Sequence, residues 1–445
     1  MMRSASRYPL RGLLAAAVFW LLSMPALAVE VERVVSPGGI EAWLVREHAN
    51  PIISLRFAFR GGAALDPAGK EGLANLASST MDEGAGELDS QTFQKTLDDK
   101  AIRLRFDTGL DTYGGRLQTL TKHRDEAFRL LRLALTAPRF DDEPVERIRA
   151  QILVGLKQDE EDPHTIASRA LRRTLFPDHP YGRPVDGTAA SVQAITADDL
   201  RGFVRRRLAR DNLIVGVVGD ITKDDLAGLL DATFGGLPAE AGPWAVPDRT
   251  AGFTGGTQVI ERNVPQSAIR YADLGLKRED PDYYTAFVMN YVLGGGGFTS
   301  RLYSEIREKR GLAYSVYSGL FPMKASAMLV GGAGTANARV KETLDVLRAE
   351  WGRMAEAGIT DKELADAKTY LTGAFPLRFT SNGRIAGILV GMQISKLGID
   401  YLKRRNALIT RVTQDDIRRV AKKLLDPKRL TVVVVGRPAG LTATQ

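Results

Sequence analysis

Two stretches of this 445-residue chain align without gaps at a constant offset of 217 residues. Residues 196–219 and 413–436 each begin with a threonine followed within three positions by two aspartates, and each ends in a valine-rich run. The threonine and the acidic residues are typical of an N-capped amphipathic helix, and the valine run of a buried strand. The sequence therefore predicts that one α+β domain is duplicated within the chain.

The length is sufficient for two domains of about 200 residues, each with its own core. Proline and glycine interrupt both helical and strand periodicity in residues 238–249, so we expect the connection between the halves there. The predicted organisation is a segment of residues 1–28, an N-terminal domain of residues 29–237, a linker of residues 238–256 and a C-terminal domain of residues 257–445.

Hydrophobic periodicity predicts a similar order of elements in each half. Residues 53–60 alternate as a strand, and helices are expected at 91–100, 124–135 and 144–158. In the second half we expect strands at 267–274, 315–322 and 327–334 and a helix at 283–293.

The first 28 residues have the pattern of a signal peptide. Arg3, Arg7 and Arg11 precede an uncharged apolar run at 12–24, and Ala28 completes a small-x-small cleavage pattern. We expect cleavage after Ala28 and a mature protein in the periplasm. A retained anchor is the alternative, and only then would the protein contact a membrane. The absence of cysteine fits an exported protein and excludes disulfides, cysteine-ligated zinc and thiol nucleophiles.

The charge balance does not indicate nucleic-acid binding. The formal net charge of +8 falls to +5 once the three signal-peptide arginines are removed. The basic runs at 205–207 and 403–405 lie in helix-like stretches, so we interpret them as solvated helix faces.

Residues 300–318 carry the most specific motif, with Arg307 and Tyr314 seven residues apart across an expected helix-to-strand junction. This segment resembles the C-terminal signature of the inverted-motif zinc peptidases, the family of pitrilysin, insulin-degrading enzyme and mitochondrial processing peptidase. The resemblance covers residues 29–438. It implies an α+β fold of two homologous domains, each a mainly antiparallel sheet with helices packed on one side, which together form one half of a clamshell.

In that family, zinc is bound by His-x-x-Glu-His, which follows an Asp-Pro-x-Gly-x-x-Gly-Leu-Ala turn, and by a glutamate about 76 residues further on. The turn is present at residues 66–74, which aligns the ligand positions with Asn75, Ser79 and Gly155 and the general-base position with Ser78. Catalytic zinc needs imidazole or carboxylate ligands, and a base needs a carboxylate, so these residues cannot supply the site. We therefore expect no metal in this chain.

No other metal motif replaces it. None of the four histidines is paired with another at helical spacing, and His179 belongs to a turn with an expected structural role. The histidines are His48, His123, His164 and His179. The glycines at 294–297 lack the lysine of a phosphate loop, so we expect them to end one helix and lead into the next, with a mobile peptide-contacting loop as the alternative.

The resemblance implies a shared active site. Arg307 and Tyr314 would bind the carbonyl of a peptide or unfolded protein held on the zinc of a homologous partner subunit, and this chain would be the non-metal subunit of a periplasmic heterodimeric peptidase, inactive alone. Three alternatives remain: a pseudopeptidase that only binds peptides, a structural core subunit, and a self-sufficient zinc enzyme with an unrecognised ligand set. For the two residues themselves the alternative is structural, with Arg307 paired to Glu305 or Glu308 and Tyr314 packed in the sheet.

Overall fold

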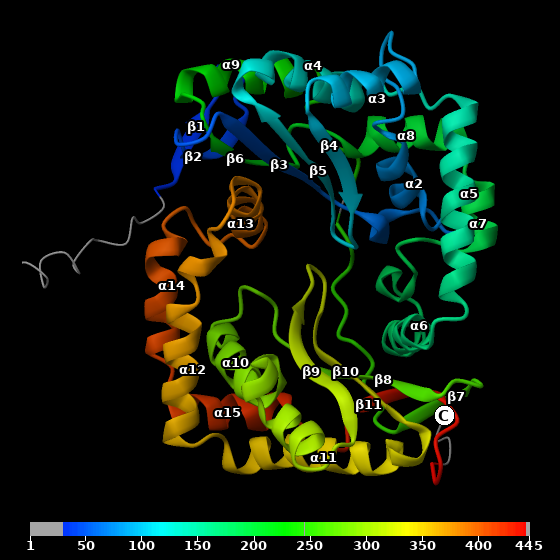
Figure 1. Cartoon of the computed structure of the whole chain (residues 1–445), viewed down its shortest axis with the longest axis vertical. Coiled ribbons are helices and arrows are strands. Elements are labelled where there is room, and N and C mark those ends of the chain that lie inside the picture. The colour runs from blue at the N-terminus through cyan, green and yellow to red at the C-terminus, as the bar shows by residue number, and fades with distance from the viewer. Residues whose placement is uncertain (1–29, 244, 442–445) are drawn as a thin grey trace, which may run out of the picture.

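The computed structural model describes residues 30–243 and 245–441, and in this part of the chain two β-sheets face each other across a central space (Figure 1). The predicted signal peptide lies outside the described residues. None of the helices in the described part is both long enough and apolar enough to cross a bilayer. The strands of the first sheet are β1 (Glu32–Val35), β2 (Glu41–Arg46), β3 (Ile52–Arg60), β4 (Arg103–Thr108), β5 (Thr112–Leu120) and β6 (Leu213–Gly219). Those of the second are β7 (Thr257–Glu261), β8 (Gln266–Leu274), β9 (Ala313–Pro322), β10 (Ala327–Ala336) and β11 (Thr431–Gly436).

The two sheets have the same topology, apart from β1, which is an additional strand at one edge of the first sheet. The first has the order β1-β2-β6-β3-β5-β4 and the second β7-β11-β8-β10-β9. In each sheet the strand of the sequence repeat, β6 or β11, is parallel to one neighbour and antiparallel to the other, and all other pairings are antiparallel. The mainly antiparallel α+β fold and its duplication are confirmed.

The repeated helices are capped as the sequence predicts. Thr196 and Thr413 each accept the backbone N–H of an aspartate three residues later, and that aspartate reaches back to the threonine N–H. The helices of the first half are α2 (Leu73–Thr80), α3 (Ser90–Asp99), α4 (Arg124–Thr136), α5 (Asp142–Asp159), α6 (Pro163–Leu175), α7 (Ala189–Ala194), α8 (Ala197–Arg207) and α9 (Lys223–Phe234). Those of the second are α10 (Tyr283–Asn290), α11 (Val340–Ala357), α12 (Asp361–Gly373), α13 (Asn382–Ile394), α14 (Tyr401–Thr410) and α15 (Gln414–Leu424).

The expected elements agree with the observed ones within a few residues, apart from the helix at 283–293. That helix is α-helical only to Asn290 and continues as a π-helix over Tyr291–Gly295. The predicted domain boundaries at residues 237 and 257 stay predictions, although the segment between them contains no helix or strand in its described residues.

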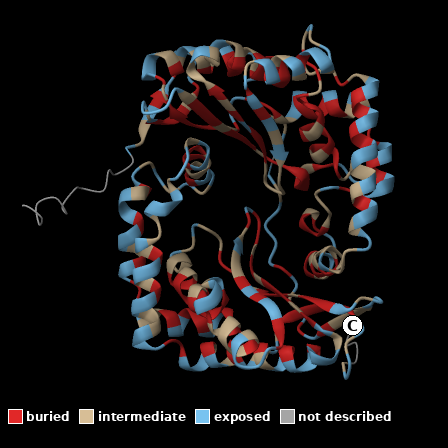
Figure 2. Cartoon of the chain, viewed as in Figure 1, coloured by how far each residue is buried: buried red, intermediate tan, exposed pale blue. Residues whose placement is uncertain are grey.

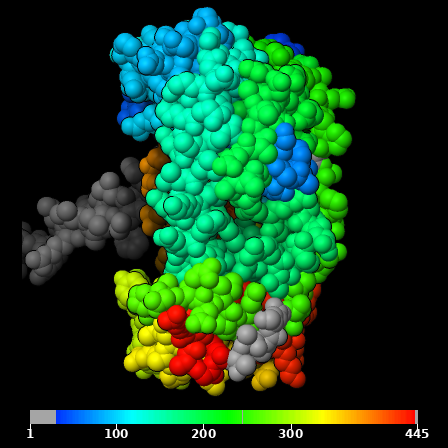
Figure 3. All heavy atoms as spheres, turned by 90° about the vertical axis from the view of Figure 1, so that its right-hand side faces the viewer, coloured from blue at the N-terminus to red at the C-terminus, as the bar shows by residue number. Residues whose placement is uncertain are grey.

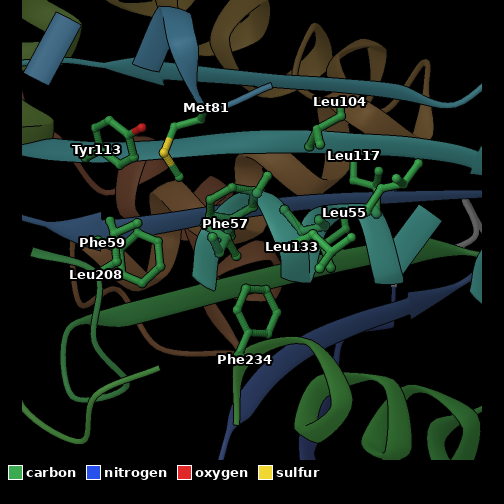
Figure 4. Close-up of a cluster of buried hydrophobic side chains, with 14 of the residues drawn as sticks. Leu55, Phe57, Phe59, Met81, Leu104, Tyr113, Leu117, Leu133, Leu208 and Phe234 are labelled. Atoms are coloured by element: carbon green, nitrogen blue, oxygen red, sulfur yellow. The ribbon is translucent and has the colours of Figure 1, made fainter. Parts of the chain in front are cut away.

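Each half has a core between its sheet and its outer helices (Figure 2). In the first half, Leu55, Phe57 and Phe59 of β3 point towards the outer helices, and the Phe57 ring lies 6.2 Å from that of Phe234 on α9 (Figure 4). Because side chains alternate along a strand, Arg56 points to the opposite, inner face of the sheet.

The inner faces carry helices exchanged between the halves. Helix α13 of the second half packs on β3 and β6, and α6 of the first half packs on β8 and β11 (Figure 1). A Cβ at Gly216 would lie 2.9 Å from the carbonyl oxygen of Ala386, so the glycine allows α13 to approach β6 closely. A helix of the other half therefore covers part of the inner face of each sheet, whereas the expectation was helices on one side only. In the view of Figure 3, the surface runs without interruption from one half to the other.

Candidate functional site

Arg307 and Tyr314 meet at the edge of the second sheet. Arg307 belongs to a π-helix at Tyr303–Glu308, and Tyr314 is the second residue of β9, which among the described strands pairs with β10 alone. The guanidinium carbon of Arg307 lies 4.8 Å from the ring centroid of Tyr314 and 4.9 Å from that of Tyr303. Two cation–π contacts thus hold the guanidinium between the rings. Tyr314 is 78% exposed, so its hydroxyl can reach a ligand.

Arg307 does not form the ion pair with Glu305 or Glu308 that was the structural alternative for this residue. Glu305 pairs with Lys309 and Arg310, each at 2.7 Å. None of the ion pairs among the described residues includes Arg307 or Glu308. Arg307 thus keeps a positive charge that no carboxylate in the described part of the chain compensates.

Two contacts fix the ends of the segment that carries this pair. At its start, Arg301 donates two hydrogen bonds, of 2.6 and 2.7 Å, to the carboxylate of Glu363 on α12. Burial alone would raise the pKa of Glu363, but Arg301 and hydrogen bonds from Thr360 outweigh it and lower that pKa to about 2. At the other end, the Ser318 hydroxyl donates to the Asn290 side chain at 2.7 Å, and the Asn290 amide donates to the Ser318 carbonyl at 3.2 Å.

The glycine run explains how the preceding helix meets β9. A Cβ at Gly294 would lie 2.4 Å from the Ser318 hydroxyl oxygen and 2.7 Å from the Ser318 nitrogen. Only glycine permits that approach. The run ends the π-helix at Gly295 and leads into a short 3-10 turn at Gly297–Thr299, which is the structural role expected from the sequence.

The positions that align with a zinc site lie on α2 and α5, which pack against each other in the first half. Helix α2 starts where the buried Asp66 carboxylate accepts the backbone N–H groups of Gly72 at 3.0 Å and Ala74 at 3.1 Å. Burial is the main influence on Asp66 and raises its pKa to about 7, although these N–H groups favour the ionised form. The turn at residues 66–74 is therefore intact as a structural unit.

The side chains on this scaffold cannot bind zinc. The hydroxyls of Ser78 and Ser79 donate to the backbone carbonyl of Asn75, at 2.8 and 3.0 Å. A Cβ at Gly155 would meet nothing within 4 Å, so the place of a third ligand is open. In the described residues no three or more histidine, aspartate or glutamate side chains are grouped so that they could hold a metal ion. The scaffold is present and the ligands of a zinc centre are not.

The histidines have other contacts. His48 bonds to Asp220 at 2.7 Å on the surface. The Nε2 atom of His179 lies 2.9 Å from the Pro247 carbonyl oxygen, and its Nδ1 accepts from the backbone N–H of Tyr181 at 3.2 Å. His179 therefore joins its turn to the linker, as expected for a structural residue. Burial, with a smaller contribution from Arg270, lowers the pKa of His164.

Comparison with known proteins identifies the family. Residues 194–371 match the family described as the peptidase M16 inactive domain. The chain is 31% identical over 332 residues to a non-peptidase homologue of Helicobacter pylori, YmxG, an alignment that spans 74% of this chain and 76% of that protein. It belongs to the M16 peptidase family. A protein of Streptomyces coelicolor named as an uncharacterized zinc protease is 32% identical over 311 residues, 68% of this chain and 67% of the relative. The crystal structure of a peptidase M16 inactive domain from Pseudomonas fluorescens has a TM-score of 0.85 and 28% identity, covering 94% of this chain and 99% of that one.

Within the M16 fold, Arg307 and Tyr314 are in contact, and the positions of Asn75, Ser78, Ser79 and Gly155 lie in the opposite half of the chain. Among the described residues, no hydrogen bond, ion pair or ring contact joins the two sets. The sequence analysis did not identify Tyr303, whose ring makes the second contact with Arg307. The spacing of four residues between them could have indicated it, because residues four apart are neighbours on a helix. It also missed the Arg301–Glu363 pair, for which 62 residues of separation left no local signal.

Proposed function

We propose that this chain is the non-metal subunit of a heterodimeric M16 zinc peptidase. The observation that carries the proposal is the geometry at β9, where an uncompensated Arg307 lies beside a Tyr314 that is 78% exposed. The same chain has no residues that fit zinc at the aligned positions on α2 and α5. In this proposal the chain supplies one half of a peptidase site, and the other half comes from a partner.

The two side chains suit a particular chemical step. A partner's zinc would supply Lewis acidity to the scissile carbonyl of a peptide. The Tyr314 hydroxyl and the Arg307 guanidinium would donate hydrogen bonds to oxygen where negative charge develops, and loss of one such donor costs about 10²–10³ in rate. The flanking ring of Tyr303 and the Arg301–Glu363 pair act before the reaction, because they hold the donors in place.

The substrate would be an extended peptide or an unfolded protein. Strand β9 forms one end of the second sheet and has one paired neighbour, so its other edge can accept a peptide strand. The predicted signal peptide supports a periplasmic location for this reaction. The name of the Helicobacter pylori relative, a non-peptidase homologue, fits a chain that does not cleave alone.

The test is peptidase activity on an unstructured peptide with this protein alone, with a zinc-bearing M16 homologue alone, and with the two mixed. We expect the mixture to exceed the sum of the separate rates. Tyr314→Phe and Arg307→Ala should each lower that gain by about 10²-fold, because each removes one donor to the developing charge.

Tyr370→Phe is the matched control. Tyr370 is also exposed, at 58%, but it stacks on Tyr291 and is far from Arg307 in sequence. An inactive mixture in which the peptide still binds to this protein would replace the proposal with a peptide-binding pseudopeptidase. Equal rates for Tyr314→Phe and Tyr370→Phe in an active mixture would show that Tyr314 is not a donor.

A further inference from the structure

A row of arginines crosses the inner face of the first sheet. In the strand register, Arg105 of β4 is directly opposite Arg116 of β5, and Arg116 is directly opposite Arg56 of β3. Side chains at such positions are about 5 Å apart at Cβ, and like charges there are destabilising. Three adjacent guanidinium groups therefore weaken the sheet unless anions lie between them.

The protein supplies anions to only two of the three. Asp107 accepts two hydrogen bonds from Arg56, both of 2.7 Å, and Asp82 accepts one from Arg105 at 3.1 Å. Arg116, the middle residue, makes no ion pair and no side-chain hydrogen bond with any described residue. The central position of the row is thus a guanidinium without a carboxylate.

This row lines a cavity of about 810 Å³, which residues of α3 and of the start of α13 also line. Arg103 and Arg384 also line it, and neither has a carboxylate partner in the described part of the chain. One further carboxylate, that of Asp98, lines the wall. The cavity is lined by these residues: Ser54, Leu55, Arg56, Gln94, Leu97, Asp98, Ile102, Arg103, Arg105, Arg116, Leu117, Gln118, Ser381, Gly383, Arg384 and Gly387.

Two more features of the cavity suit a polar, negatively charged occupant. The Ser54 side chain lines it at 3% exposure, and its hydroxyl has no hydrogen-bond partner in the described part of the chain. The N-terminus of α13, a helix of 13 residues capped by Ser381, also lies at the cavity and contributes the positive end of its dipole.

We propose that this cavity binds acidic side chains of an extended peptide, with Arg116 and Arg103 as the principal contacts. The proposal rests on the proposed function for the kind of ligand, a peptide, and adds the class of peptide. Guanidinium groups bind carboxylates in paired hydrogen bonds, and the Arg56–Asp107 contact already shows this geometry on the same face.

The spacing of the arginines favours a peptide over a small anion. Neighbouring strands are about 4.8 Å apart, so the backbone positions of the row span about 10 Å across three strands, a width over which more than one carboxylate can be bound. Along β4, Arg103 and Arg105 are two residues apart on the same face, about 6.8 Å. Acidic residues at alternate positions of an extended peptide have this same spacing.

The experiment is fluorescence anisotropy with this protein alone and two labelled ten-residue peptides, one alternating Glu and Thr and the other Gln and Thr. We expect the Glu peptide to bind at least about tenfold more tightly than the Gln peptide. Arg116→Gln should weaken binding of the Glu peptide by about tenfold. Arg411→Gln is the control with the same change of charge, since Arg411 is exposed at the end of α14 and outside the cavity. It should leave the affinity unchanged.

A second variant separates binding from folding. Arg116→Glu places a carboxylate between Arg56 and Arg105, so it should fold at least as stably as the natural protein and still lose the Glu peptide. Equal affinity for the Glu and Gln peptides, or unchanged binding by Arg116→Gln, would overturn the proposal. Tight binding of inorganic tripolyphosphate without binding of the Glu peptide would also overturn it, in favour of a small-anion site.

These measurements do not depend on cleavage. An inactive mixture with a zinc-bearing homologue would refute the heterodimeric peptidase and leave a preference for acidic peptides intact. An active mixture without that preference would refute only the acidic-peptide site.

Discussion

The Arg301–Glu363 pair offers a direct test of what holds the Arg307 segment in place. The perturbation is Glu363→Gln, which keeps the size of the side chain and removes its charge. The Arg301 side chain is 12% exposed and one of its guanidinium nitrogens, Nη1, already lacks a hydrogen-bond partner among the described residues. Loss of the carboxylate therefore leaves a nearly buried cation without its counter-charge.

The magnitude follows from the pKa of Glu363, which falls from an ordinary 4.5 to about 2. Each pH unit of difference corresponds to about 1.4 kcal/mol, so the ionised Glu363 carboxylate, through Arg301 and Thr360 together, would contribute about 3 kcal/mol to the free energy of unfolding at pH 7. Because the Glu363 side chain is 29% exposed, solvent screens the pair, and we expect a loss of about 2 kcal/mol. In a half of about 200 residues this lowers the melting temperature by about 4–8 °C.

The sign of the pH dependence is also determined. A carboxylate whose pKa is lowered by folding stabilises the folded state above its unfolded pKa, and this contribution disappears as the pH falls towards the folded pKa. The loss of unfolding free energy caused by Glu363→Gln should thus be complete at pH 7 and should fall to less than half of that value at about pH 3.

The assay is thermal unfolding of the natural protein and the variant between pH 7 and pH 3. Glu356→Gln is the control, because Glu356 is exposed on α11 and forms no ion pair with any described residue. A deficit at pH 7 no larger than that of the control would refute the reasoning. So would a deficit of the same size at pH 7 and pH 3, since that would reflect a lost packing contact and not a lost charge.

Three further predictions concern other sites. Gly331→Ala should destabilise the protein by about 1–3 kcal/mol in thermal unfolding, because its Cβ would lie 2.2 Å from the ring of the buried Tyr271. In the control Gly319→Ala, the new Cβ would have nothing within 4 Å, and the stability should change by less than about 0.5 kcal/mol. Because folding raises the pKa of Asp66 to about 7, the folded protein binds a proton more readily than the unfolded chain, and its stability should fall as the pH rises from 4 to 7. Asp66→Asn should reduce this dependence of stability on pH in unfolding scans. A variant that combines Asn75→His, Ser78→Glu, Ser79→His and Gly155→Glu should bind one zinc per chain, as measured by elemental analysis. The reason is that α2 and α5 already pack together and that a side chain at Gly155 would have free space. A variant that still purifies without zinc would show that more than the ligands has been lost.

The sequence alone predicts those parts of the structure that depend on residues close together along the chain. The capping boxes at Thr196 and Thr413 use residues three positions apart, and the alternation of residues 53–60 alone indicates β3. The repeat then required the two sheets to be equivalent, and they are. The positions of Arg307 and Tyr314 across a helix-to-strand junction were equally readable, because seven residues separate them.

The rest depends on contacts that spacing does not encode. Helices α6 and α13 each pack on the sheet of the other half, and local periodicity does not indicate a contact between parts of the chain so far apart. The arginine row requires the register of three strands, of which β3 and β5 are more than 50 residues apart. The π-helix that begins at Tyr291 depends on the close approach of Gly294 to β9, which is also a tertiary contact.

Both proposed sites follow from the same argument about charge. Many arginines in the described part of the chain are paired with carboxylates, including Arg56, Arg105 and Arg301. Arg307 and Arg116 are not, although each is held in place, Arg307 by two tyrosine rings and Arg116 by the sheet. In both proposals the ligand brings oxygen atoms to a positioned cation that has no internal anion, a carbonyl at Arg307 and carboxylates at Arg116.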